Sequence, residues 1–188
     1  MIKSILAGVC ISIGCISYLS VDNKYLGTFL VSLGLLTVVT FQLNLFTGKV
    51  GYLRTVEHKL EYLWTLFKIW IGNLIGCFFT ALGCLQTRIN IDASAIIATK
   101  NSDSYWSLLI LGIFCGMLMH IAVAGYKKSK NPLIVVLPVM VFILIGAEHC
   151  VADMFYWFYA DTINIPALLV ITLGNTIGAN FIEESIME

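Results

Sequence analysis

Charged side chains are scarce in this sequence: Asp, Glu, Lys and Arg make up 12% of its 188 residues, and hydrophobic types make up 59%. Soluble domains carry about 25% charged residues, so this chain has too little polar surface to stay dissolved in water. The sequence also lacks a long polar segment that could fold as a catalytic module. We therefore expect a single integral membrane domain over residues 1–188 and no enzyme activity.

Cysteines are absent from the loops, and an extended basic patch is absent as well. All six cysteines fall in apolar stretches, which argues against structural disulfides: Cys10, Cys15, Cys77, Cys84, Cys115 and Cys150. The formal net charge is zero, and the basic cluster at residues 127–130 is typical of the cytoplasmic end of a membrane helix. The sequence gives no indication of a nucleic-acid partner, and the expected surroundings are a lipid bilayer.

Six apolar stretches with few or no charges have the length of membrane-spanning helices. An α-helix needs about 20 apolar residues to cross about 30 Å of hydrocarbon. The stretches cover residues 4–21, 25–48, 69–87, 104–126, 131–147 and 162–182. We expect an all-α membrane protein with six transmembrane helices. The first stretch has no cleavage site of the kind that ends a signal peptide, so we interpret it as a retained helix.

The placement of lysine and arginine predicts the orientation in the membrane. With the N-terminus in the cytoplasm, eight of these residues fall on the cytoplasmic side and three, Lys24, Arg88 and Lys100, on the other. The positive-inside rule favours that arrangement, and an even number of spans returns the C-terminus to the cytoplasm. We expect a multi-pass protein of a bacterial-type inner membrane with both termini cytoplasmic.

An internal repeat is the most informative feature that the chain does contain. The heptapeptide WIGNLIG at residues 70–76 returns 102 positions later, at residues 172–178, as TLGNTIG. The two copies predict one repeat over about residues 1–87 and a second over about 103–188. The same shift makes residues 106–120 the counterpart of the first stretch. Three spans in each repeat place the second half upside down relative to the first, so the repeat is inverted.

Each repeat also contains one polar interruption inside an apolar stretch. Residues 44–48 interrupt the second stretch, and the shift of 102 leads to residues 146–150 in the fifth. Thr47 and His149 each lie 26 residues before the asparagine of the echoed heptapeptide, and we interpret them as equivalent. Non-helical backbone at membrane depth must be buried in protein or line a water-filled cavity. We therefore expect helices two and five to be broken around a transport pathway between the repeats.

His149 is the sharpest candidate for chemistry in these interruptions. A histidine with an unperturbed pKa of about 6.5 exchanges protons near neutral pH, and ionisable groups inside a membrane indicate function by default. The alternative is a structural histidine that only satisfies hydrogen bonds. Five further polar residues are expected to support the loops: Asn44, Asn73, Glu148, Asp153 and Asn175.

Together these residues resemble the formate/nitrite transporter family. The resemblance rests on LFTG at residues 45–48, EHCVADMF at residues 148–155, the repeated Gly-Asn-x-Ile-Gly, and Lys100 just before the fourth stretch. It covers essentially the whole chain. It implies an aquaporin-like fold, a homopentamer with one pathway per protomer, and passage of small monovalent anions such as formate, nitrite, hydrosulfide or acetate. No cofactor and no metal are expected.

The resemblance also implies roles for individual residues. Thr47 would hydrogen-bond toward His149, the central residue of the pathway between two hydrophobic constrictions. Lys100 would attract anions into an outer vestibule. Five apolar side chains would form the constrictions: Leu35, Leu45 and Phe46 on the cytoplasmic side, and Val31 with Phe142 on the outer side.

Three residues depart from the family pattern. Gly116 stands in the fourth stretch where asparagine is common, which removes a hydrogen-bond partner for His149 or the substrate. Asp153 stands where asparagine is usual, which adds a negative charge near the pathway. Val31 replaces a frequent aromatic residue, so a wider outer constriction is expected.

These expectations combine into a transport mechanism with two rivals. Lys100 would concentrate the anion, and a proton relayed through His149 or water would neutralise it for passage through a dry constriction. One rival is a pore for small neutral solutes, but the sequence contains no Asn-Pro-Ala motif. The other is an intramembrane metalloenzyme using His149, Asp153 and Glu148, but zinc sites need three protein ligands and no second His-rich motif occurs.

Overall fold

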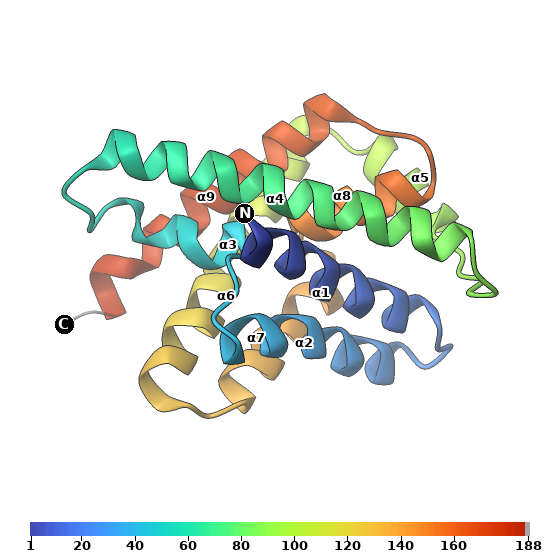
Figure 1. Ribbon diagram of the computed structural model, residues 1–188, viewed down its shortest axis with the longest axis horizontal. Coiled ribbons are helices and arrows are strands. Elements are labelled where there is room, and N and C mark those ends of the chain that lie inside the picture. Colours follow the sequence, from blue (N-terminus) through green and yellow to red (C-terminus); the bar gives the residue numbers. More distant parts are fainter. Residues whose placement is uncertain (187–188) are drawn as a thin grey trace.

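The chain folds into helices and connecting loops, with no strand in the part that the structure describes. The computed structural model covers the backbone of residues 1–186 and the side chains of residues 1–182. Figure 1 shows the helices, whose bounds are α1 (Ile2–Leu19), α2 (Lys24–Thr40), α3 (Phe46–Lys49), the 3₁₀ helix η1 (Val50–Leu53), α4 (Lys59–Leu85), α5 (Ser94–Ser102), α6 (Tyr105–Ser129), α7 (Leu133–Leu144), α8 (Cys150–Tyr159) and α9 (Ile165–Ile186). The all-helical fold predicted from the sequence is confirmed over these residues.

Four helices are long and apolar enough to cross a membrane, namely α1, α4, α6 and the Ile165–Ile182 part of α9. The helices α2 and α7 are apolar but shorter, with 17 and 12 residues. Both end inside the apolar stretches predicted for them, because the chain leaves the helix at each polar interruption. A short helix resumes after each interruption, α3 in the first half and α8 in the second.

The two interruptions have the same backbone structure. Gln42 (φ 52°) and Gly146 (φ 72°) adopt the left-handed conformation that turns the chain out of the preceding helix. The residue after each of them donates a hydrogen bond back into that helix, from Leu43 N to Val38 O and from Ala147 N to Phe142 O, both at 2.9 Å. Each pair of corresponding residues is 104 positions apart.

One buried asparagine fastens each interruption to the rest of its half. The side chain of Asn73 in α4 is hydrogen-bonded to Phe46 N (2.9 Å), Ser4 O (2.7 Å) and Asn44 O (2.9 Å). The side chain of Asn175 in α9 is bonded in the same way to Cys150 N (2.9 Å), Gly112 O (2.8 Å) and Glu148 O (2.8 Å). Buried backbone polar groups need hydrogen-bond partners, and these amides provide them for both loops.

The hydrogen bonds of the two asparagines also fix which residues correspond. The asparagines are 102 positions apart, but the residues whose N–H groups they bind, Phe46 and Cys150, are 104 apart. His149, the N-cap of α8, therefore corresponds to Leu45, the N-cap of α3. The predicted equivalence of His149 and Thr47 is wrong by two positions.

The first helices of the halves correspond at a third offset. The carbonyl groups that the asparagines bind in α1 and α6 belong to Ser4 and Gly112, which are 108 positions apart. The predicted counterpart of the first stretch, residues 106–120, is therefore displaced by six positions along α6. Helices and loops of slightly different length in the two halves account for the changing offset.

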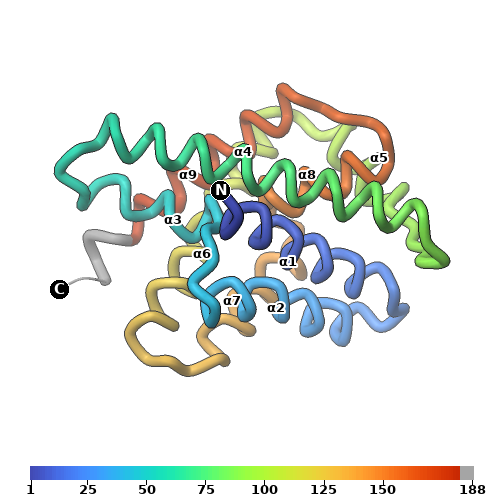
Figure 2. The backbone as a smooth tube through the Cα atoms, in the orientation of Figure 1, coloured from blue at the N-terminus to red at the C-terminus, as the bar shows by residue number. Residues whose placement is uncertain are grey.

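Each half is a bundle of three helices, and the short helices reach across between the halves. The helix α1 packs against α2 and α4, and α6 packs against α7 and α9. In addition α8 packs against α4 of the first half, and α3 with η1 packs against α9 of the second. Figure 2 shows α1 and α2 running alongside each other, with α4 passing on the other side of α1. The residues that follow each interruption are thus buried between both halves.

The echoed heptapeptides mark a close contact between helices in each half. A Cβ atom on Gly76 of α4 would collide with the carbonyl oxygen of Ile5 in α1, and one on Gly178 of α9 would collide with that of Ile113 in α6. Small residues let helix backbones approach closely in membranes. The echo in the sequence therefore reports the same helix contact made in each half.

Candidate functional site

His149 caps the N-terminus of α8 and is buried, with 3% of its surface exposed. Its Nδ1 accepts a hydrogen bond from the backbone N–H of Ala152 at 3.1 Å. A ring nitrogen that accepts carries no hydrogen, so the hydrogen of the neutral ring is assigned to Nε2. Nε2 lies 2.8 Å from the hydroxyl oxygen of Thr47 and donates to it. The two bonds hold a neutral imidazole in one tautomer and one orientation.

The His149 ring is positioned by parts of the chain that are distant in sequence. Its partner Thr47 lies in α3 of the other half and is fully buried. The ring of Phe142 in α7 packs against the imidazole, with 5.9 Å between the ring centres. The imidazole thus lies where α3, α7 and α8 meet.

The His149 side chain borders a cavity of about 320 Å³, which we call the Lys100 cavity. Its lining includes Lys100, Glu148 and Asp153 together with His149. Four ionisable side chains from α5, the second interruption and α8 therefore share one small space.

Lys100 contributes to this cavity from α5, yet only 8% of its surface is exposed. Its ammonium group pairs with the carboxylate of Glu148 and with Asp153 Oδ1, the latter at 2.7 Å. Burial acts to lower the pKa of Lys100, but the charges of the two acids outweigh burial, so the pKa is raised and the ammonium stays protonated. Two carboxyl groups thus share one cation, and the local charge differs from that of a free vestibule lysine.

The position of Glu148 differs from its predicted role in supporting the loop. Its carboxylate pairs with Lys100, and within the described residues it receives no hydrogen bond from loop backbone. Asp153 also joins the ion pair rather than the loop. The loops are supported by the two buried asparagines of α4 and α9, and Asn44 contributes through its backbone carbonyl.

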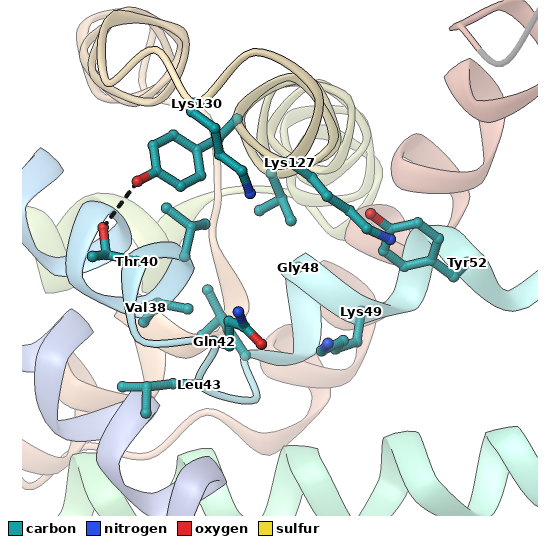
Figure 3. A pocket seen from close by; sticks show the side chains of 13 residues that line it. Val38, Thr40, Gln42, Leu43, Gly48, Lys49, Tyr52, Lys127 and Lys130 are labelled. Carbon is teal, nitrogen blue, oxygen red and sulfur yellow. Dashed lines mark hydrogen bonds between the residues drawn. The ribbon is translucent and has the colours of Figure 1, made fainter.

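A second cavity, of about 490 Å³, is lined by Lys49, Lys127 and Lys130, and we call it the Lys127 cavity. Figure 3 shows these side chains around it. Two of the lysines lie over aromatic rings, Lys127 over Tyr52 at 5.0 Å and Lys130 over Tyr126 at 5.7 Å. Such cation–π contacts favour one position of a flexible side chain. Among the described residues, no acid lines this cavity.

Sequence reasoning missed the Lys127 cavity. The cluster at residues 127–130 indicates only a cytoplasmic anchor, and the positive-inside count places Lys49 on the same side. That shared side was the available signal. The cavity itself depends on the packing of α3 against α6, which brings residues nearly 80 positions apart in sequence to one opening.

The five apolar residues predicted for constrictions take different places. Val31 and Phe142 line the Lys100 cavity, and Leu45 lines the Lys127 cavity. Leu35 and Phe46 line neither of these two cavities and are buried in the interior.

The two cavities lie toward opposite ends of α6. Lys127 is in the last turn of α6, whereas α5, which carries Lys100, directly precedes the first turn. A helix of 25 residues is about 37 Å long. The buried contact between Thr47 and His149 lies in the interior between α3 and α8.

Gly116 has a packing role. A Cβ atom at this position would collide with the backbone carbonyl of Asn175, and Gly8 approaches Asn73 in the same way in the other half. An asparagine side chain has no room at this position. The prediction that Gly116 removes a hydrogen-bond partner from the pathway is therefore wrong.

Comparison with known proteins identifies the family. The family model described as formate/nitrite transporter matches residues 1–185. The chain belongs to the formate/nitrite transporter family. Membership of this family, together with the four membrane-length helices, makes it a multi-pass membrane protein of a transporter family rather than an enzyme family. No group of three or more His, Cys, Asp or Glu residues that could hold a metal ion occurs in the part of the chain described.

Curated members of the formate/nitrite transporter family share about a quarter of their residues with the chain. The formate channel FocA of Haemophilus influenzae is 26% identical over 182 residues, covering 81% of this chain and 63% of that protein. The nitrite transporter NirC of Salmonella typhimurium is 26% identical over 211 residues, covering 94% and 77%. The chain therefore spans less than two thirds of the length of FocA.

Solved structures of the family share the fold. A pentameric formate channel with formate bound superposes with a TM-score of 0.78 at 25% identity, covering 97% of this chain and 92% of that one. An ion channel of the family superposes with a TM-score of 0.81 at 23% identity, covering 95% and 84%. The second likeness bears on the fold alone.

Proposed function

We propose that this protein transports small monovalent weak-acid anions, such as formate, nitrite, hydrosulfide or acetate, between the Lys127 cavity and the Lys100 cavity. The observation that carries the proposal is the oriented His149 imidazole, buried between the two halves and bordering one cavity. Family membership and the named activities of FocA and NirC support the substrate class.

In this proposal the chain crosses the membrane six times as a 3+3 inverted repeat, with repeats over about residues 1–87 and 103–188. The matched hydrogen bonds of the two interruptions support the repeat. Both termini lie in the cytoplasm, so the Lys127 cavity opens to the cytoplasm and the Lys100 cavity to the outside. Five protomers form the assembly, as in the pentameric formate channel, and each holds one pathway.

The anion crosses the interior in its neutral form. Moving a bare carboxylate into an apolar interior costs tens of kcal/mol in the idealised limit. Protonating a weak acid costs about 1.4 kcal/mol for each unit by which the pH exceeds its pKa. When the pH is three units above the pKa of the acid, protonating the anion costs about 4 kcal/mol. Protonation therefore costs less than moving the charged anion into the interior.

Each transport event carries one proton with one anion. The anion takes a proton in one cavity, crosses the region of Leu35 and Phe46 as a neutral acid, and releases the proton in the other. His149 donates a hydrogen bond from its Nε2–H to the passing acid in place of Thr47, and Thr47 restores the ring orientation afterwards. The proton itself comes from water, or through His149 when Nδ1 takes up one proton as Nε2 gives one up.

The test is uptake of formate, nitrite and acetate by proteoliposomes containing the purified chain. We expect uptake that rises as the external pH falls, and His149→Phe is expected to abolish it because phenylalanine fills the site without a polar hydrogen. Glycerol uptake by the same vesicles would indicate the alternative function, a pore for small neutral solutes. Full formate uptake by His149→Phe would remove the histidine from the mechanism.

A further inference from the structure

Asp153 is an acid with too little positive charge around it. The residue is 1% exposed, and its Oδ1 lies 2.7 Å from the Lys100 ammonium nitrogen. The same nitrogen pairs with Glu148. With both acids ionised, the buried cluster would carry a net charge of −1, and two carboxyl groups that share one site do not both ionise readily.

The second oxygen of Asp153 is an independent observation. Oδ2 is buried and has no hydrogen-bond partner among the described residues. A carboxylate oxygen without a donor is costly in a protein interior. A protonated oxygen, in contrast, carries no charge, so leaving it without a donor costs less.

The surrounding elements provide no further cation to Asp153. The other titratable groups near it or in the same cavity are thiols and phenols, which never carry a positive charge: Cys15 and Tyr18 of α1, Cys77 of α4, Cys115 of α6, and Cys150 and Tyr156 of α8. His149 is neutral in the observed hydrogen-bond arrangement, because its Nδ1 accepts from backbone. Within the described part of the chain, Lys100 is therefore the one positive charge that faces Asp153.

We propose that Asp153 holds a proton in the resting protein and that this proton makes the Lys100 cavity receptive to anions. The proposal rests on the proposed transport function and adds a pH control to it. With Asp153 protonated, Glu148 alone balances Lys100, and the cluster is neutral. With Asp153 ionised, the cavity carries an uncompensated negative charge that repels anions.

The sign of the pH effect follows from these two states. The receptive state is the protonated one, so it is fully populated at low pH and is lost as the pH rises through the range in which Asp153 ionises. Above that range the protonated fraction falls about tenfold per pH unit. This loss adds to the decline that comes from protonation of the substrate itself.

Infrared spectroscopy tests the proton without any transport. The C=O stretch of a protonated carboxyl group is expected in the wild-type spectrum at neutral pH. It should disappear in Asp153→Asn, which has the same size and cannot ionise, and should shift to lower frequency when aspartate is labelled with carbon-13. The proposal is overturned by the absence of the band at neutral pH, or by a band that carbon-13 labelling of glutamate shifts and labelling of aspartate does not.

The pH dependence of formate uptake tests whether the proton on Asp153 controls the entry of anions. The ratio of formate uptake by the wild type to uptake by Asp153→Asn, measured from about pH 5 to about pH 9, cancels the titration of the substrate. We expect this ratio to fall with rising pH, and a ratio that stays flat contradicts the control by Asp153. If neither protein carries any anion, the proposed transport function fails, while the infrared result still decides whether Asp153 is protonated. Thermal unfolding of both proteins verifies that they are folded.

Discussion

Both ring nitrogens of His149 already form hydrogen bonds, and this limits the ability of the ring to take up a second hydrogen. To become charged, the imidazole must gain a hydrogen on Nδ1, which now accepts from the N–H of Ala152. Two N–H groups would then face each other at the first turn of α8. A charged His149 therefore requires a local rearrangement, and the ring acts most easily as a neutral donor through Nε2.

Thr47 is expected to orient the ring through its hydroxyl group alone. Thr47→Ala removes the 2.8 Å bond to Nε2 and leaves a buried donor without a partner, which costs about 1–3 kcal/mol of stability. We expect formate uptake to fall at least severalfold, because the ring loses its fixed position. Thr47→Ser keeps the hydroxyl and is the control. Equal uptake by the alanine and serine variants, with both folded, contradicts this role.

The individual residues of the site could be predicted only in part. His149 and Thr47 stand out because polar residues are rare in apolar stretches. The pairing of Lys100 could not be found in this way, since its partners are 48 and 53 positions away and lie beyond a whole membrane-length helix. Polar residues in a loop give no sign that one of them will be buried.

The helices themselves follow from the sequence better than their correspondence does. Apolar stretches and polar interruptions indicate where α2 and α7 end, and the echo indicates the asparagines that fasten the loops. A single shift of 102 could not align all parts, because the offset is 108 in the first helices and 104 in the interruptions. Small differences in element length leave no mark in composition or periodicity.

The helix contact at the echoed glycines gives a prediction for stability. Gly76→Ala places a Cβ against the carbonyl of Ile5 in α1, and such overpacking typically costs about 1–3 kcal/mol. Gly83→Ala in the same helix is the control, because nothing lies within 4 Å of its added Cβ and alanine is the better helix former by about 1 kcal/mol. Thermal unfolding in detergent should therefore move in opposite directions for the two variants. If Gly76→Ala and Gly83→Ala both lowered the stability, the contact of Gly76 with α1 would not be the cause of the loss.

The two ends of the molecule differ in charge although the two halves have related backbones. The Lys100 cavity contains one cation and two acids, whereas the Lys127 cavity contains three lysines and, in the described residues, no acid. Leu45 and His149 occupy corresponding N-caps, yet one is apolar and the other polar. The two halves therefore share a backbone arrangement, and differences in their side chains make the two ends of the molecule different.

The lysines of the Lys127 cavity are expected to speed the arrival of anions from that side. A cluster of one sign in a concave opening raises the local concentration of the opposite charge, and salt screens the effect over about 8–10 Å at physiological ionic strength. The double substitution of Lys127→Gln and Lys130→Gln should lower the initial rate of formate uptake at low salt, several fold, from the side to which this cavity opens. At about 1 M salt, where screening extends to about 3 Å, the variant and the wild type should converge.

Lys128→Gln is the matched control for this experiment, because Lys128 is exposed and does not line the cavity. It removes a charge from the same helix end, so a general effect of net charge would lower its uptake as well. Uptake from the opposite side should be lowered less in the double variant, since Lys127 lies in the last turn of α6 and Lys100 precedes its first turn. Equal slowing from both sides, or equal slowing by Lys128→Gln, would show that Lys127 and Lys130 act through the net charge of the protein and not on the entry of anions into this cavity.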